Sequence, residues 1–166
     1  MTSKTKQYWL MKSEPDEFSI DDLAQRKNQI EPWSGVRNFQ VRTWIKNSMR
    51  KGDLAFFYHS SCKIPGVAGI IKIVSDAYPD PTAFDLQSDY YDPKSNPQKP
   101  TWYCVDVQLV KKFPRFVPLQ ELRATPALHT LRILERGSRL SITPVTEKEW
   151  EIIVELGSRN QQMSIL

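Results

Sequence analysis

The sequence predicts a single α+β domain built around a small, curved or closed β-sheet. The chain has 166 residues, of which 40% are hydrophobic and 25% are charged, and this is typical of one soluble globular domain. Segments with strand and helix patterns follow one another without a regular βαβ repeat. Hairpin-like loops as well as helices separate the expected strands. Together these observations favour the α+β class.

In the N-terminal half, short apolar runs indicate strands and one amphipathic run indicates a helix. Ser19 followed by Asp22 predicts the N-cap of a short helix. A later segment has apolar residues at helical spacing and ends before Gly52, a residue typical of helix termini. The expected elements are strand 7–11, helix 19–26, helix 39–50 and strands 53–59 and 66–74.

The C-terminal half begins with a long loop, residues 75–100, that is rich in Pro, Asp, Ser and Tyr. Long loops in compact domains are often functional. Further on, Thr146 with Glu149 predicts a capping box for the last helix. The expected elements are strand 101–111, helices 118–123 and 126–135, strand 139–143 and helix 146–156. We expect one domain over residues 1–156 and a tail over 157–166.

The composition argues against several classes of protein. The N-terminus has no secretory pattern, and Lys72 interrupts the most apolar later run, which is too short to span a membrane. Cys62 and Cys104 lack metal-site spacing, and the chain has only two histidines, so we expect no metal and no cofactor. Without an export signal, both cysteines are expected to be reduced thiols in a cytoplasmic protein.

Charge is segregated along the chain, which carries a net charge of +4. Residues 37–51 hold five positive charges and no negative one, and residues 108–139 hold seven positive and two negative charges. Residues 76–106 hold six aspartates against two lysines. This pattern suits a polyanionic partner, although two solvated faces without a partner would also produce it.

The segment Trp33-Ser34-Gly35-Val36-Arg37-Asn38 has the residue types that a base-binding pocket needs. An indole offers a flat face for stacking, and an amide can pair with the edge of a base. A tryptophan that only anchors a loop in the core is the alternative. Tyr58, His59 and Ser60 at a strand end could present polar groups to a cavity, or could be core and turn residues. Trp102, Tyr90 and Tyr91 are further candidates for an aromatic wall.

Motifs along most of the chain resemble the EVE domain family, over about residues 7–156. The matching segments are YWLMKSEPDEFSIDDL, PWSGVRNFQVRTWI, GDLAFFYHSSCKIPGVAGIIKIV, AYPDPTAFD, YYDP, PTWYCVDVQLV and RLSITP. The resemblance implies a PUA-like fold, in which helices flank a small, strongly bent β-barrel. It also implies kinship with YTH domains, which hold 6-methyladenine in an aromatic cage. EVE domains are regarded as readers of modified bases, notably modified cytosines, in DNA or RNA.

The resemblance also implies roles for individual residues. Trp33 would be the main stacking wall, Trp102 a second one, and Asn38 a reader of the base edge. Lys12 and Ser13 would contribute backbone groups where the first strand ends. The whole expected base pocket comprises Lys12, Ser13, Trp33, Ser34, Val36, Asn38, Tyr58, His59, Ser60 and Trp102. The expected contacts to the nucleic-acid backbone are Arg37, Arg42, Lys46 and Lys63.

We therefore expect a non-enzymatic, monomeric module that binds a modified cytosine or a methylated adenine in DNA or RNA. It would act in the cytoplasm, with access to the nucleoid in a bacterium, or in the nucleus of a eukaryote. One alternative is an amidohydrolase similar to ASCH domains that acts on a modified nucleoside through Lys12 and Glu14, although no threonine has matching spacing. Another is a protein-interaction module whose basic helix docks an acidic partner.

Overall fold

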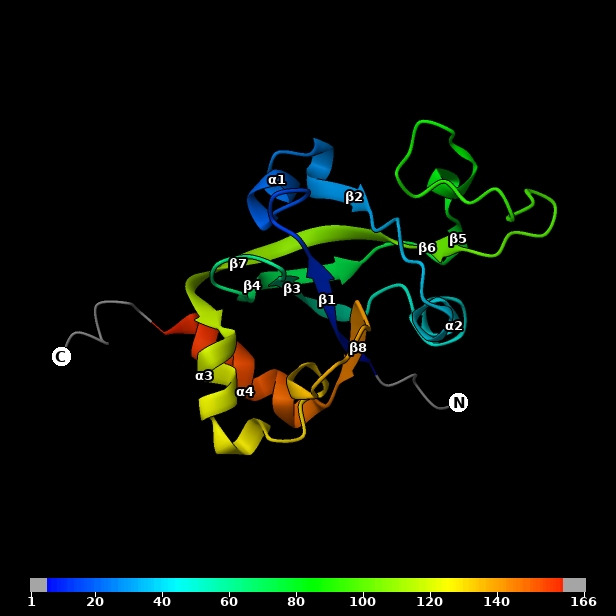
Figure 1. The fold of residues 1–166 in the computed structure, drawn as a ribbon. Coiled ribbons are helices and arrows are strands. Elements are labelled where there is room, and N and C mark those ends of the chain that lie inside the picture. The colour runs from blue at the N-terminus through cyan, green and yellow to red at the C-terminus, as the bar shows by residue number, and fades with distance from the viewer. Residues whose placement is uncertain (1–5, 160–166) are drawn as a thin grey trace, which may run out of the picture.

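The protein is an α+β domain centred on a six-stranded mixed sheet, as seen in a computed structural model that describes residues 6–159 (Figure 1). The sheet order is β2-β7-β4-β3-β1-β8, with β1 parallel to β3 and all other neighbours antiparallel. A separate two-stranded ribbon pairs β5 with β6. The strands are β1 (Tyr8–Ser13), β2 (Ile30–Pro32), β3 (Leu54–His59), β4 (Gly66–Ile73), β5 (Tyr78–Pro79), β6 (Tyr103–Cys104), β7 (Asp106–Pro118) and β8 (Ile142–Val145).

Four α-helices pack around this sheet; α3 and α4 lie together below it in Figure 1, whereas α1 lies above it, beside the edge strand β2. They are α1 (Ile20–Ala24), α2 (Phe39–Asn47), α3 (Leu119–Ala124) and α4 (Glu147–Ser158). Short 3₁₀ turns cover Lys27–Gln29, Pro81–Phe84, Pro126–Leu128 and Arg132–Leu134. The predicted N-cap of α1, Ser19, and the predicted capping box of α4 are present, and Ser19 with Asp22 also forms a capping box.

Alternation along the central strands divides the core into two layers. In β3, Phe57 belongs to the layer that includes residues of α1 and α2, whereas Phe56 and Tyr58 belong to the layer that includes residues of α3 and α4. Successive side chains of a strand point to opposite faces, so one sheet supports both layers. Trp33 joins the first layer, and the candidate site lies on that side of the sheet.

Some elements differ from the sequence-based prediction. The third long strand does not run over 101–111. A short β6 precedes β7, which continues to Pro118 because its C-terminal part pairs with β4. The expected helix 126–135 consists of two separate 3₁₀ turns. Helix α4 continues through Gly157, which is buried against Phe113, and ends at Ser158, two residues later than predicted. Residues 160–166 lie outside the described part.

Two further findings concern residues 6–159. None of the helices in this range combines the length and hydropathy required to cross a membrane. In the same range, no group of three or more His, Cys, Asp or Glu side chains is arranged to hold a metal ion.

Candidate functional site

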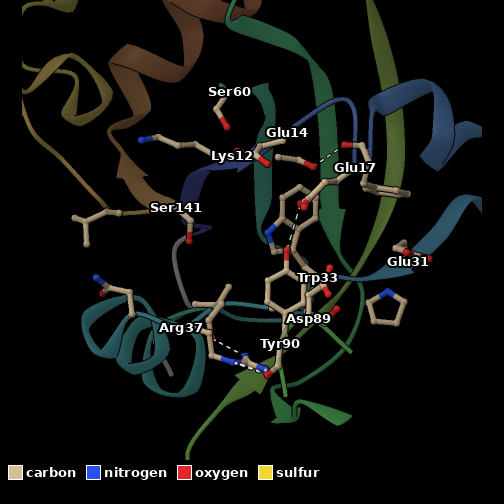
Figure 2. A pocket seen from close by; sticks show the side chains of 18 of the residues that line it. Lys12, Glu14, Glu17, Glu31, Trp33, Arg37, Ser60, Asp89, Tyr90 and Ser141 are labelled. Atoms are coloured by element: carbon tan, nitrogen blue, oxygen red, sulfur yellow. Dashed lines mark hydrogen bonds between the residues drawn. The ribbon is translucent and has the colours of Figure 1, made fainter. Parts of the chain in front are cut away.

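A cavity of about 970 Å³ lies beside Trp33, where the end of β1, the segment 32–38 and the loop that carries Tyr90 come together (Figure 2). Its volume is at the upper end of the range usual for small-molecule sites. The structure brings much of the expected base pocket to it, namely Lys12, Ser13, Trp33, Ser34, Val36, Asn38 and Ser60. The cavity is therefore the candidate functional site.

Trp33 is both a core residue and a wall of this cavity. Only 7% of the residue is exposed, and its ring meets Phe57 edge to face with 5.3 Å between centroids. The Trp33 backbone N–H donates a hydrogen bond of 2.7 Å to the carbonyl oxygen of Val105. These contacts fix the position of the indole. A fixed aromatic wall loses little conformational freedom when a flat ligand stacks on it.

Three of the expected pocket residues do not line the cavity. Tyr58 lies in the second core layer, on the other face of the sheet, where burial raises the pKa of its hydroxyl to about 12. His59 is half-buried and its Nε2 accepts a 3.2 Å hydrogen bond from the N–H of Ile20. Burial of its imidazole lowers the His59 pKa. Both side chains thus have structural contacts of their own.

Trp102 is the third of these residues, and it packs away from the cavity. Its ring stacks on that of Phe39 at 5.0 Å between centroids, and its indole N–H donates a 2.7 Å hydrogen bond to the carboxylate of Asp92. Tyr90, from the same loop as Asp92, lines the cavity instead. Tyr90, which the sequence suggested only as one of several loop candidates, therefore lines the cavity with Trp33, as does Phe18.

Arg37 lines the cavity, but its guanidinium is engaged by the protein. Nη1 lies 3.1 Å from the Asp80 carboxylate, and Nε and Nη2 donate to the backbone carbonyl of Tyr90 at 3.1 and 2.5 Å. The Asp80 side chain is fully buried and also accepts a 2.7 Å hydrogen bond from the N–H of Gly35. This ion pair joins the loop of Trp33 to the loop of Tyr90.

The other expected backbone contacts lie outside the cavity lining. Arg42 donates to the carbonyl of Thr101 at 3.2 Å, and the Lys46 ammonium lies 4.6 Å from the centroid of the Tyr103 ring. Lys63 borders a different, mostly apolar groove of about 560 Å³ at the start of α3.

Asn38, which does line the cavity, uses its side-chain oxygen as the N-cap of α2, where it accepts a 3.0 Å hydrogen bond from the N–H of Val41. The side-chain NH₂ group has no hydrogen bond to any residue in the range 6–159, so the amide could still donate to a ligand. One residue can thus serve the helix and the site.

Sequence reasoning did not assign the charged lining of the cavity. Four carboxylate side chains contribute to it, from Glu14, Glu17, Glu31 and Asp89, and Arg139 adds a cation. Three of these acids come from segments far from the WSGVRN motif in the sequence, so no local pattern associates them with it. Lys12 also contributes, and burial of its amine lowers the Lys12 pKa.

The fold and the cavity together define a PUA-like domain, in which a curved mixed sheet with flanking helices supports a cavity against one face. The chain belongs to the EVE domain family, whose model matches residues 7–156. It is 42% identical over 165 residues to thymocyte nuclear protein 1 of Homo sapiens, and the matched region covers 90% of this chain and 73% of the human protein.

Solved structures agree with this assignment. A protein from Pseudomonas putida superposes with a TM-score of 0.86 at 49% identity, over 90% of this chain and 99% of that one. The human THYN1 protein in complex with 5-methylcytosine containing DNA has a TM-score of 0.87 at 41% identity, over 93% and 99%. The YTH domain of Zygosaccharomyces rouxii MRB1, in complex with N6-methyladenosine RNA, shares the fold, with a TM-score of 0.54 at 12% identity over 94% and 89%. The expected PUA-like fold is confirmed.

Proposed function

We propose that this protein is a non-enzymatic reader of a modified base, and that the base occupies the cavity beside Trp33. The observation that carries the proposal is a rigid indole that lines a cavity large enough for a nucleotide base. The human relative in complex with 5-methylcytosine containing DNA supports a modified cytosine as the ligand. The protein would act as a monomer on DNA or RNA, in the cytoplasm with access to the nucleoid in a bacterium, or in the nucleus of a eukaryote.

Elementary energetics predict modest affinity. Taking a base out of a stack costs a few kcal/mol, and stacking on an aromatic side chain returns about 1–3 kcal/mol per base. Burying one extra methyl group contributes only about 0.8 kcal/mol. Discrimination between modified and unmodified bases therefore depends on the methyl group together with hydrogen bonds at the base edge, and we expect micromolar binding.

The charged residues of the cavity suggest where the phosphates lie. Lys12 and Arg139 line it and form no ion pair within residues 6–159, whereas Arg37 is paired with Asp80. Phosphates would be attracted to the two unpaired cations and repelled by the carboxylates. We therefore add Lys12 and Arg139 to the proposed backbone contacts, beside Arg42, Lys46 and Lys63.

The test is binding of single-stranded oligonucleotides that differ only at one position, which is 5-methylcytosine, cytosine or an abasic site. Trp33→Leu should weaken binding of the 5-methylcytosine strand by about 5- to 100-fold, the equivalent of one stacking contact. Trp44→Leu is the matched control, because Trp44 packs against the same core layer but does not line the cavity. Unchanged affinity in Trp33→Leu, or an equal loss in both variants, would contradict the proposal.

A second candidate function is hydrolysis of an acylated nucleoside. The observation in its favour is that Lys12, with its lowered pKa, lines the same cavity as Glu14 and Glu17. A less basic amine beside carboxylates is a usual arrangement for proton transfer. Incubation with N4-acetylcytidine decides between the two functions: turnover that Lys12→Ala abolishes would establish the enzyme and displace the reader.

A further inference from the structure

Tyr90 reaches the cavity from the long loop between β5 and β6, and contacts hold its ring on two sides. Its hydroxyl donates a 3.2 Å hydrogen bond to the Glu17 carboxylate, which belongs to the segment after β1 (Figure 2). A Cβ atom placed on Gly35 would lie 2.9 Å from two carbons of the Tyr90 ring. The ring therefore rests directly on the glycine of the WSGVRN segment, and its hydroxyl is bonded to a different wall of the cavity.

The backbone of Tyr90 is held as firmly as its ring. Arg37 donates two hydrogen bonds to the Tyr90 carbonyl oxygen, and its third nitrogen contacts the Asp80 carboxylate. Asp80 in turn accepts hydrogen bonds from the N–H of Gly35 at 2.7 Å and from the hydroxyl of Thr82 at 2.6 Å. The fork of a guanidinium can make these bonds at once, because its five N–H groups have a fixed geometry.

These contacts give Tyr90 an ordered position at the cavity although 37% of the residue is exposed. An exposed tyrosine on a loop usually samples several rotamers, and fixing one of them costs conformational entropy. Here the contacts with Arg37, Gly35 and Glu17 already fix the Tyr90 side chain in the free protein, so ligand binding does not have to order it. An aromatic side chain fixed in this way at the mouth of a base-sized cavity is suited to contacting a flat ligand.

We infer that Tyr90 is a second aromatic contact of the bound base, and that the Arg37–Asp80 ion pair is the positioning element that sets its place. The inference rests on the proposed function and assigns two new roles within it. Tyr90 touches the base, and Arg37 acts through Tyr90 and does not bind phosphate.

The neighbouring tyrosine provides a matched control for Tyr90. Tyr91 is 39% exposed, stands next in the chain and does not line the cavity. Tyr90→Ala should weaken binding of the 5-methylcytosine strand by about 5- to 100-fold and leave binding of the abasic strand unchanged. Tyr91→Ala should leave both unchanged, and Tyr90→Phe, which keeps the ring, should retain most of the affinity. Wild-type affinity in Tyr90→Ala, or an equal loss on the abasic strand, would overturn the inference.

The role of Arg37 is tested by the salt dependence of binding. Removing a phosphate contact to a single strand lowers the slope of log K against log salt concentration by about 0.7. Arg37→Gln should keep the wild-type slope and lose affinity for the 5-methylcytosine strand only, and Arg37→Lys should restore part of it by keeping a cation beside Asp80. A slope reduced by about 0.7 in Arg37→Gln would show that Arg37 binds phosphate and would refute the positioning role.

Failure of this inference can be told apart from failure of the proposed function. If Trp33→Leu weakens binding of the 5-methylcytosine strand and Tyr90→Ala does not, the reader function stands and the role of Tyr90 is refuted. If the wild-type protein binds the 5-methylcytosine and abasic strands equally, the proposed function fails first. Urea denaturation of each variant, followed by circular dichroism, verifies that the compared proteins are folded.

Discussion

Substitution of Gly35 by alanine tests how tightly the two loops of the cavity are joined. Gly35 has a φ angle of +86°, and an added Cβ would lie 2.9 Å from the Tyr90 ring. The left-handed backbone alone costs a non-glycine residue about 1–2 kcal/mol. The Tyr90 ring must also move, and this strains the hydrogen bond from its hydroxyl to the Glu17 carboxylate. Losing a hydrogen bond to a charged group costs about 1.5 kcal/mol, and somewhat less at an exposed site such as this one. We expect a total destabilisation of about 2–3 kcal/mol.

Gly137→Ala separates the two contributions. Gly137 has a φ angle of +71°, and its added Cβ would meet no heavy atom within 4 Å. It should therefore cost only the backbone share, about 1–2 kcal/mol. Urea denaturation measures the two free energies of unfolding, and in a thermal melt each kcal/mol corresponds to about 2–4 °C for a domain of this size. Gly35→Ala alone should also weaken binding of the 5-methylcytosine strand. Equal destabilisation with unchanged binding in both variants would refute the tight contact of Tyr90 with this loop.

Three further predictions concern other parts of the molecule. Because burial lowers the His59 pKa below 6.5, the imidazole of the unfolded chain takes up a proton before that of the folded protein as the pH falls. The free energy of unfolding should therefore decrease from about pH 6.5 downward through the folded-state pKa, and it should decrease less in His59→Gln. Urea denaturation at several pH values measures both. Asp53→Ala removes the buried acceptor of the Trp9 indole N–H, 3.1 Å away, and should cost about 2–4 kcal/mol in urea denaturation. Arg139→Gln should reduce the salt slope of single-strand binding by about 0.7, whereas Lys148→Gln, on α4 and outside the cavity lining, should leave the slope unchanged.

Local patterns were sufficient to predict most of the fold. The N-cap of α1, the capping box of α4 and the alternation along β3 depend on residues a few positions apart, and the structure confirms them. Strand β2 was not predicted, because its three residues are ordered by pairing with Asp106–Gln108, more than 70 positions away. The end of β7 was misjudged for the same reason, since long-range pairing and not local hydropathy extends it.

The candidate site was predictable only where one motif carries it. The segment 33–38 lies at the cavity as expected, but the partner of Arg37 is Asp80, 43 positions later, and no spacing rule connects them. Tyr58 is instructive, because the alternation that places Phe57 on one face of β3 places Tyr58 on the other. Since Trp33 packs on Phe57, the same pattern argued against Tyr58 as a neighbour of the indole.

The charges around the cavity determine which part of a nucleotide can enter it. Four carboxylates line the cavity together with Lys12 and Arg139, and the positive charge of Arg37 is matched by buried Asp80, so a phosphate near the carboxylates would be repelled. A cytosine or adenine instead presents an exocyclic amino group, and acidic side chains readily accept its hydrogens. In the proposed complex, a strand would therefore insert its base beside Trp33 and place its phosphates next to Arg139 and Lys12, which line the same cavity. Under the proposed function, this mixed lining would suit a base turned out of its strand, with the carboxylates near its amino group and the two unpaired cations near its phosphates.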